Sequence, residues 1–85
     1  MSAEYTCAVD GAQTDSSGPG VVVSIFLTDL GGSFARTEFR APNAVRREML
    51  AQALTAISTG SQVFAVLDDP NSAPPWKCYL LRVNA

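Results

Sequence analysis

Five stretches of the chain carry the hydrophobic pattern of β-strands. Residues 4–12 alternate between two faces, with Tyr5, Cys7 and Val9 on one of them, and residues 21–28 form a continuous run of β-branched and aromatic side chains. Runs of this length and composition are typical of strands rather than of buried helices. The same criteria predict three further strands, at residues 33–40, 61–67 and 76–83.

Segments rich in glycine, proline and aspartate separate the predicted strands. Residues 29–32, with the sequence Asp-Leu-Gly-Gly, predict a tight reversal into the third strand, because these residue types tolerate positive φ angles. Residues 15–20 and 68–75 contain too many turn-forming residues to be regular. On an unbroken third strand, Phe34 and Phe39 would face opposite sides, so either one is exposed or a bulge corrects the register.

After residue 43 the hydrophobic period changes to that of an amphipathic helix of about four turns. Asn43 is expected to cap the start of this helix, and Gly60 to end it in a left-handed conformation. The residues predicted to share its apolar face are Val45, Met49, Leu50, Ala53, Leu54 and Ile57.

The predicted order of elements is β-β-β-α-β-β. Eighty-five residues are enough for a single domain only, which we place at residues 1–85. An open sheet of five short strands would expose its edges, whereas closure into a small barrel removes them. We therefore predict a mainly β protein, an OB-fold-like five-stranded Greek-key barrel with one helix. The alternative is an α+β open sheet with the helix on one face.

The composition argues against catalysis. The chain has no histidine, which removes the commonest general base near neutral pH, every Ser-His or Cys-His pair and the commonest metal ligand. Asp68, Asp69 and Asn71 lack the spacing of an EF-hand loop, so we interpret them as a polar turn. The sequence predicts a protein that is not an enzyme and that uses no cofactor and no metal.

Charge is unevenly distributed along the chain. The net charge is −2, which disfavours long-range attraction to DNA or to anionic membranes, and no run approaches the roughly 20 apolar residues of a membrane helix. Four of the six basic residues nevertheless fall between residues 36 and 47: Arg36, Arg40, Arg46 and Arg47. We consider three ways in which this positive charge is compensated: by solvent, Glu38 or acids elsewhere in the fold; by a second copy of the chain in a ring; or by an anionic ligand such as a sialylated glycan or RNA.

Trp76 and the two cysteines are the remaining residues of interest. Trp76 follows two prolines and either stacks on a sugar or base or anchors the mouth of the barrel. Cys7 and Cys78 are either two buried reduced thiols or a disulfide that closes a loop of about 70 residues. Residues 1–5 lack the layout of a signal peptide, so the sequence leaves the location open: cytoplasmic if the sequence is complete, and secreted or periplasmic if a leader has been removed.

Residues 49–66, followed by a polar loop and a cysteine in the last strand, resemble small bacterial OB-fold proteins related to toxin B subunits. These include the cholera-like and pertussis-like pentamers and uncharacterised relatives, and the layout matches over roughly residues 5–83. The resemblance implies an OB-fold, a homo-oligomer such as a pentamer, and a disulfide similar in placement to Cys7 and Cys78. The sugar-binding residues of those proteins are not recognisable, so the resemblance assigns no binding site.

We therefore expect a small non-enzymatic binding domain, with an oligomeric carbohydrate-binding module as the leading hypothesis. The alternatives are an OB-fold that binds single-stranded nucleic acid and a protein-interaction or accessory domain. The acidic net charge favours the glycan over the nucleic acid. The candidate ligand or interface residues are Arg36, Arg40, Arg46, Arg47 and Trp76.

Overall fold

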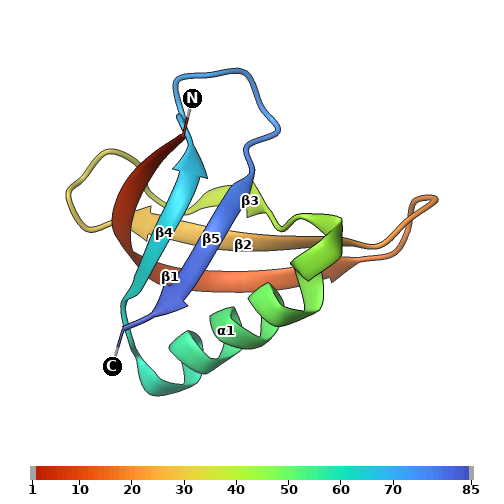
Figure 1. The fold of residues 1–85 in the computed structure, drawn as a ribbon, viewed down its shortest axis with the longest axis horizontal. Coiled ribbons are helices and arrows are strands. Elements are labelled where there is room, and N and C mark those ends of the chain that lie inside the picture. Colours follow the sequence, from red (N-terminus) through yellow and green to blue (C-terminus); the bar gives the residue numbers. More distant parts are fainter. Residues whose placement is uncertain (1, 85) are drawn as a thin grey trace.

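One antiparallel five-stranded sheet and one helix make up the computed structural model, which describes residues 2–84 (Figure 1). The elements are β1 (Ser2–Asp15), β2 (Val22–Asp29), β3 (Thr37–Arg40), the 3₁₀ turn η1 (Asn43–Val45), α1 (Arg46–Thr59), β4 (Val63–Asp68) and β5 (Cys78–Val83). The strand order in the sheet is β3-β2-β1-β4-β5. The predicted mainly β class and the chain order of strands and helix are confirmed.

β1 is long enough to serve two halves of the sheet. Its residues 2–7 pair with β4, and its residues 7–15 pair with β2. A β-bulge between Val9 and Gly11 interrupts the pairing with β2, and bulges increase local bending and twist. The bent β1 therefore carries the β2–β3 half of the sheet across the direction of the β4–β5 half (Figure 1).

The sheet is not closed into a barrel, so the prediction of a closed barrel is wrong. A single parallel bridge joins Arg40 to Lys77, where the Arg40 amide donates to the Trp76 carbonyl oxygen at 2.8 Å. The contact does not extend into a ladder, because it joins the last residue of β3 to the residue directly before β5. β3 begins at Thr37 rather than at the predicted residue 33. Arg36, directly before it, has a φ of +49°, which is incompatible with an extended strand.

The hydrophobic core lies between α1 and the inner face of the sheet. Alternate residues of β2 and β4 point inwards, as the two-residue period of a strand requires. The helix contacts β1, β2 and β5. The buried residues are Cys7, Val23, Ile25, Leu27, Phe39, Ala41, Met49, Ala53, Ala56, Val63, Ala65, Leu67, Cys78 and Leu81.

The start of α1 differs from the prediction, whereas its end agrees with it. Asn43 belongs to η1 and does not cap the helix; α1 begins at Arg46, and no side chain caps it. The cause is an intervening tight turn, in which the Val45 amide donates to the Pro42 carbonyl oxygen at 3.1 Å. Gly60 has a φ of +68° and its amide donates to the Ala56 carbonyl oxygen, so the predicted left-handed helix end is confirmed.

The buried face of α1 is narrower than the apolar stripe in the sequence. Met49, Ala53 and Ala56 are buried, whereas Leu54 is 50% exposed and Ile57 is 43% exposed. Alanines at the contact let the helix lie close to the sheet, which leaves the longer side chains of the stripe at its flank. Leu54 and Ile57, which were predicted to share the apolar face of the helix, are therefore not part of the core.

This orientation of α1 predicts unequal effects for neighbouring substitutions. Ala53→Leu is expected to lower the free energy of unfolding by about 1–3 kcal/mol, because Ala53 is 0% exposed and a larger side chain there overpacks the core. Leu54→Gln is expected to change it by no more than about 0.5 kcal/mol. Urea unfolding of both variants at neutral pH tests the difference, and a larger loss in Leu54→Gln would contradict the described helix orientation.

Cys7 and Cys78 are both buried and both free, so the disulfide suggested by the toxin-like layout is not formed. Cys7 pairs in register with Val63 and Cys78 with Leu67, positions four residues apart on β4, or about 13 Å along that strand. Burial raises the pKa of each thiol to about 12, which keeps both protonated at neutral pH. The interpretation as two reduced buried thiols fits the structure.

Phe34 lies in the loop between β2 and β3, which removes the conflict between Phe34 and Phe39. Its ring contacts Tyr5 at 5.2 Å and Phe39 at 5.3 Å between centroids. Both phenylalanines therefore reach the core without a bulge in β3.

Within residues 2–84, no helix is long and apolar enough to cross a membrane.

Candidate functional site

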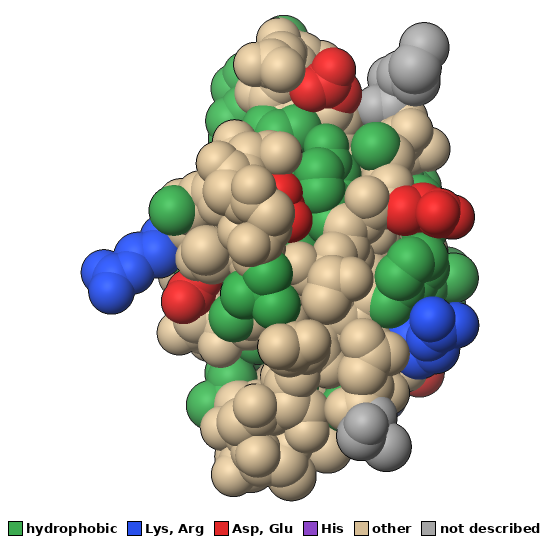
Figure 2. All heavy atoms as spheres, turned by 90° about the vertical axis from the view of Figure 1, so that its left-hand side faces the viewer, with side chains coloured by type: hydrophobic (Ala, Val, Ile, Leu, Met, Phe, Trp, Pro, Cys, Tyr) green, Lys and Arg blue, Asp and Glu red, His purple; other side chains and the backbone are tan. Residues whose placement is uncertain are grey.

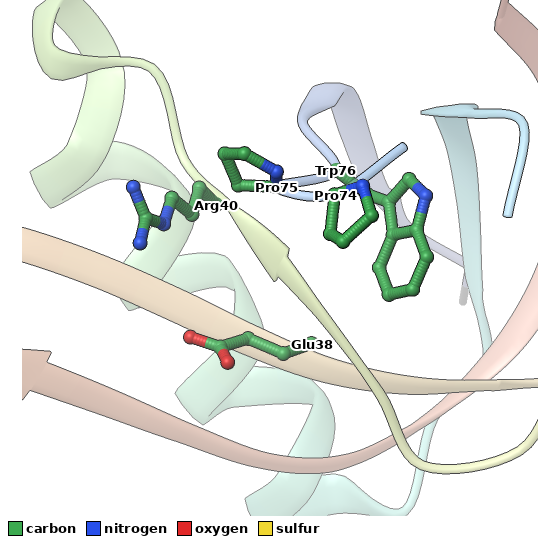
Figure 3. Close-up of a pocket in the computed structure, with 5 residues that line it drawn as sticks. All are labelled: Glu38, Arg40, Pro74, Pro75 and Trp76. Carbon is green, nitrogen blue, oxygen red and sulfur yellow. The ribbon is translucent and has the colours of Figure 1, made fainter. Parts of the chain in front are cut away.

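A groove lies between β3 and the loop that connects β4 to β5 (Figure 3). Its volume is about 310 Å³. Glu38 and Arg40 extend to the same side of β3, and Pro74, Pro75 and Trp76 of the loop lie on the other side of that strand in this view (Figure 3). The lining residues are Glu38, Arg40, Pro74, Pro75 and Trp76.

The alternation of β3 determines which of its residues enter the groove. Glu38 and Arg40 share the outer face, and Phe39 between them is fully buried in the core. Opposite them on β2, Glu38 pairs with Phe26 and Arg40 pairs with Ser24. The Ser24 hydroxyl donates to the Glu38 carboxylate at 2.6 Å, which orients that side chain within the outer face.

Asp68 holds the base of the β4–β5 loop. Its carboxylate accepts hydrogen bonds from the Tyr79 hydroxyl at 2.7 Å and from the Lys77 amide at 2.9 Å. These two donors, the tyrosine first, hold the pKa of Asp68 below its ordinary value, and the same contact raises the pKa of Tyr79. The two ends of the loop are thereby fixed beside each other.

The far part of the loop is also internally bonded. The Asn71 amide donates to the Asp69 carboxylate at 2.9 Å, and the Trp76 indole N–H donates to the Ser72 carbonyl oxygen at 3.0 Å. The peptide bond between Pro74 and Pro75 is cis. The loop therefore forms an ordered wall of the groove.

Trp76 packs against the core and also lines the groove. Its ring packs against Phe39, with 6.4 Å between centroids, so it anchors the loop to the core. The same ring lines the groove, where Pro74 and Pro75 lie between it and the Arg40 side chain (Figure 3). Because its N–H is bonded within the loop, Trp76 offers a ligand an apolar surface rather than a hydrogen bond.

A second hollow, of about 430 Å³, lies on the other side of Arg40. Arg40 lines both spaces, and the bridge between β3 and β5 brings Lys77 beside it. The residues around this hollow are Val22, Arg40, Ala41, Pro42, Asn43, Lys77 and Tyr79. Two cations from distant parts of the sequence, Arg40 and Lys77, therefore lie side by side where β3 meets β5. We call this contact the Arg40 seam.

The five predicted site residues do not form one cluster. Arg40 and Trp76 line the same groove, but Arg36 lines a separate hollow with Asp10, Gly11 and Phe26. Arg46 donates to the Asn43 carbonyl oxygen at 3.0 Å, and Arg46 and Arg47 line neither of the two spaces beside Arg40.

Sequence reasoning missed Glu38 and Lys77 as parts of the site. Strand alternation placed Glu38 on the same face as Arg40, but as a partner that compensates the arginines rather than as a site residue. The sequence offered no comparable signal for Lys77, because only the bridge to Arg40 brings it near.

Within residues 2–84, no group of three or more Asp, Glu or Cys side chains is placed to hold a metal ion. Figure 2 shows the side of the molecule on which the β2–β3 loop projects, and charged side chains are scattered there among uncharged atoms. The Arg40 seam is therefore the most specific arrangement of charge and apolar surface that we describe.

Comparison with protein-family models, with curated proteins and with solved structures finds no match to this chain. The function is therefore argued from the geometry of the groove and from the sequence.

Proposed function

We propose that this chain is a non-enzymatic binding domain whose groove beside β3 takes an acidic carbohydrate, such as a sialylated glycan. The observation that supports it most is the position of Arg40, which lines the groove together with the Glu38 carboxylate and the apolar wall of Pro74, Pro75 and Trp76. Arg40 also lines the second hollow, where Lys77 adds another positive charge. A sugar acid offers complementary chemistry to each of these: a carboxylate, several hydroxyls and an apolar ring face.

Arg40 is the principal anion ligand in this proposal. Its guanidinium presents parallel N–H donors that match the two oxygens of a carboxylate, and such charge-assisted pairs are the strong ones. Lys77 adds a second positive charge across the seam. Because Arg40 stands between two spaces, a ligand in either one is within its reach.

Glu38 favours a hydroxylated ligand over a nucleic-acid backbone. A carboxylate accepts hydrogen bonds from sugar hydroxyls, and it repels the repeated phosphates of a nucleic-acid backbone more strongly than the single carboxylate of one sialic acid. The net charge of −2 also opposes a polyanion at long range. The volumes of about 310 and 430 Å³ lie at the lower end of the range for ligand pockets, which suits one or two sugar units.

The OB-like arrangement is part of the same proposal. The helix follows β3, β4 pairs with β1, and the single parallel bridge sits where β3 and β5 would adjoin in a closed barrel. These features support a partly opened relative of that topology. Assembly into a ring of the toxin B type stays a prediction.

Arg40→Ala is expected to weaken binding of 3′-sialyllactose by about 10- to 100-fold, because the variant loses a charge-assisted pair. Titration by calorimetry or by NMR against lactose as the neutral comparison measures the effect. Arg82→Ala is the matched control, because this substitution also removes one positive charge, but from the other half of the sheet. Arg82 lies there over the Phe64 ring, 4.6 Å from its centroid.

Equal affinity for lactose and sialyllactose, or no binding of either, would contradict the proposal. So would an Arg82→Ala variant that binds as weakly as Arg40→Ala. If instead a short oligonucleotide binds with strong salt dependence and needs Arg40, the groove belongs to single-stranded nucleic acid and not to a glycan.

A further inference from the structure

A third hollow adjoins the groove on the outer face of the sheet. It has a volume of about 390 Å³ and is lined by Asp10, Gly11, Phe26 and Arg36. Phe26 pairs directly across β2 and β3 with Glu38, which lines the groove. Such paired side chains are about 5 Å apart and share one face, so the two spaces are neighbours.

Gly11 keeps this hollow open. It pairs with Phe26 across β1 and β2, and a Cβ at Gly11 would lie 3.7 Å from the Phe26 ring. Any longer side chain on Gly11 would extend over that ring. Without one, the half-buried Phe26 presents an uncovered aromatic surface as the floor of the hollow.

Arg36 occupies a backbone conformation that favours glycine. Its φ is +49°, and it is the only residue other than glycine with a positive φ in the described part of the chain. Its amide donates to the Thr28 hydroxyl oxygen at 3.0 Å, and the Thr28 hydroxyl donates to the Asp10 carboxylate. Arg36 thus stands where a glycine would relieve backbone strain. The hydrogen bonds through Thr28 link it to Asp10.

We propose that this hollow is a second sugar subsite, in line with the Arg40 groove, so that the protein binds an acidic oligosaccharide longer than one charged unit. The Phe26 ring stacks on the apolar face of the second acidic sugar, the Arg36 guanidinium binds its carboxylate, and the Asp10 carboxylate accepts from its hydroxyls. This inference rests on the proposed function, since it extends the same ligand along the same face.

The test compares 3′-sialyllactose with the corresponding disialylated oligosaccharide in calorimetric titrations. The wild-type protein is expected to bind the disialylated ligand at least about tenfold more tightly, because only that ligand reaches both subsites. Gly11→Leu fills the hollow and is expected to abolish this gain while the affinity for sialyllactose stays unchanged. Arg40→Ala is expected to weaken both ligands.

Arg36→Gly separates a binding role from a structural one. It removes the guanidinium and relieves the backbone, so the midpoint of thermal unfolding is expected to rise while the gain for the disialylated ligand is lost. Gly11→Ala, whose Cβ makes only ordinary contact with Phe26, serves as the milder variant if Gly11→Leu does not fold. It is expected to reduce the gain in part.

The outcomes separate this inference from the proposed function. Binding of sialyllactose through Arg40 with no gain for the disialylated ligand overturns the second subsite and leaves the first. A gain that survives Gly11→Leu or Arg36→Gly overturns the assignment to this hollow. Failure of both ligands to bind overturns the two together.

Discussion

Phe39→Ala is expected to lower the free energy of unfolding by about 3–5 kcal/mol. Phe39 is 0% exposed, and its ring lies between Phe34, at 5.3 Å, and Trp76, at 6.4 Å between centroids. Truncation therefore leaves a cavity among aromatic neighbours that are held by separate loops. Chemical unfolding monitored by circular dichroism measures the loss.

The same residue links the stability of the core to the shape of the groove. The milder variant Phe39→Leu keeps an apolar side chain but shortens the contact with Trp76, so the indole is expected to gain freedom and the groove to lose part of its wall. Trp76 is the only tryptophan, so its fluorescence should shift towards that of an exposed indole. Sialyllactose affinity should fall with it.

Val63→Ala is the control for this argument. Val63 is fully buried like Phe39, but it lies at the start of β4 and lines neither space beside Arg40. It is expected to lower stability while tryptophan emission and ligand affinity stay at the wild-type values. If Val63→Ala changes emission and affinity as Phe39→Leu does, general loosening rather than the Phe39–Trp76 contact controls the groove.

The sequence predicted those parts of the fold that depend on local pattern. The second strand, expected at residues 21–28, is Val22–Asp29, and Gly60 ends the helix as its residue type requires. The length of β3 was not predictable in this way. It depends on Arg36, whose positive φ accompanies a hydrogen bond to Thr28 eight residues away, and a strand pattern carries no information on such a contact.

The burial of the helix was mispredicted for a related reason. Periodicity identifies an apolar sector but not the part of it that the sheet covers, and the alanines at 53 and 56 turn out to be the contact. Leu54 and Ile57 fit the same sector equally well on a helical wheel. Only the position of α1 over the sheet distinguishes them.

The candidate site was predicted in part. Arg40 and Trp76 were singled out separately, and the bridge at residues 40 and 77 brings them together. Gly11 was a signal not used: a glycine inside a strand often marks a bulge or a close approach, and here it accompanies both a bulge and the open surface of Phe26.

Acidification is expected to destabilise the protein through Asp29 and Asp68. Asp29 is 8% exposed, and its carboxylate accepts from the Gly31 amide at 3.1 Å and from the Ser33 amide at 3.0 Å, which lowers its pKa. The Tyr79 hydroxyl and the Lys77 amide lower the pKa of Asp68. The Asp29 carboxylate thus holds the β2–β3 loop, and the Asp68 carboxylate holds the β4–β5 loop.

The sign follows from the direction of these shifts. In the unfolded chain both pKa values return to the ordinary 3.8, so unfolding takes up protons at lower pH. The stabilisation is complete above pH 3.8 and is lost as the pH falls through the lower pKa values of the folded state. Tyr79 acts in the opposite sense: its pKa is raised from 10.0, so its contribution is present below pH 10 and is lost as the pH rises through the folded value.

Urea unfolding between pH 2.5 and 7 tests this assignment. The double variant Asp29→Asn with Asp68→Asn is expected to be less stable than the wild type at pH 7 and to lose less further stability below pH 4, because two carboxylates no longer take up protons. Tyr79→Phe removes the largest cause of the low pKa of Asp68, so it should shift the Asp68 part of the acid limb towards pH 3.8 and weaken the alkaline limb. An acid limb in the double variant as steep as that of the wild type would assign acid sensitivity to other carboxylates.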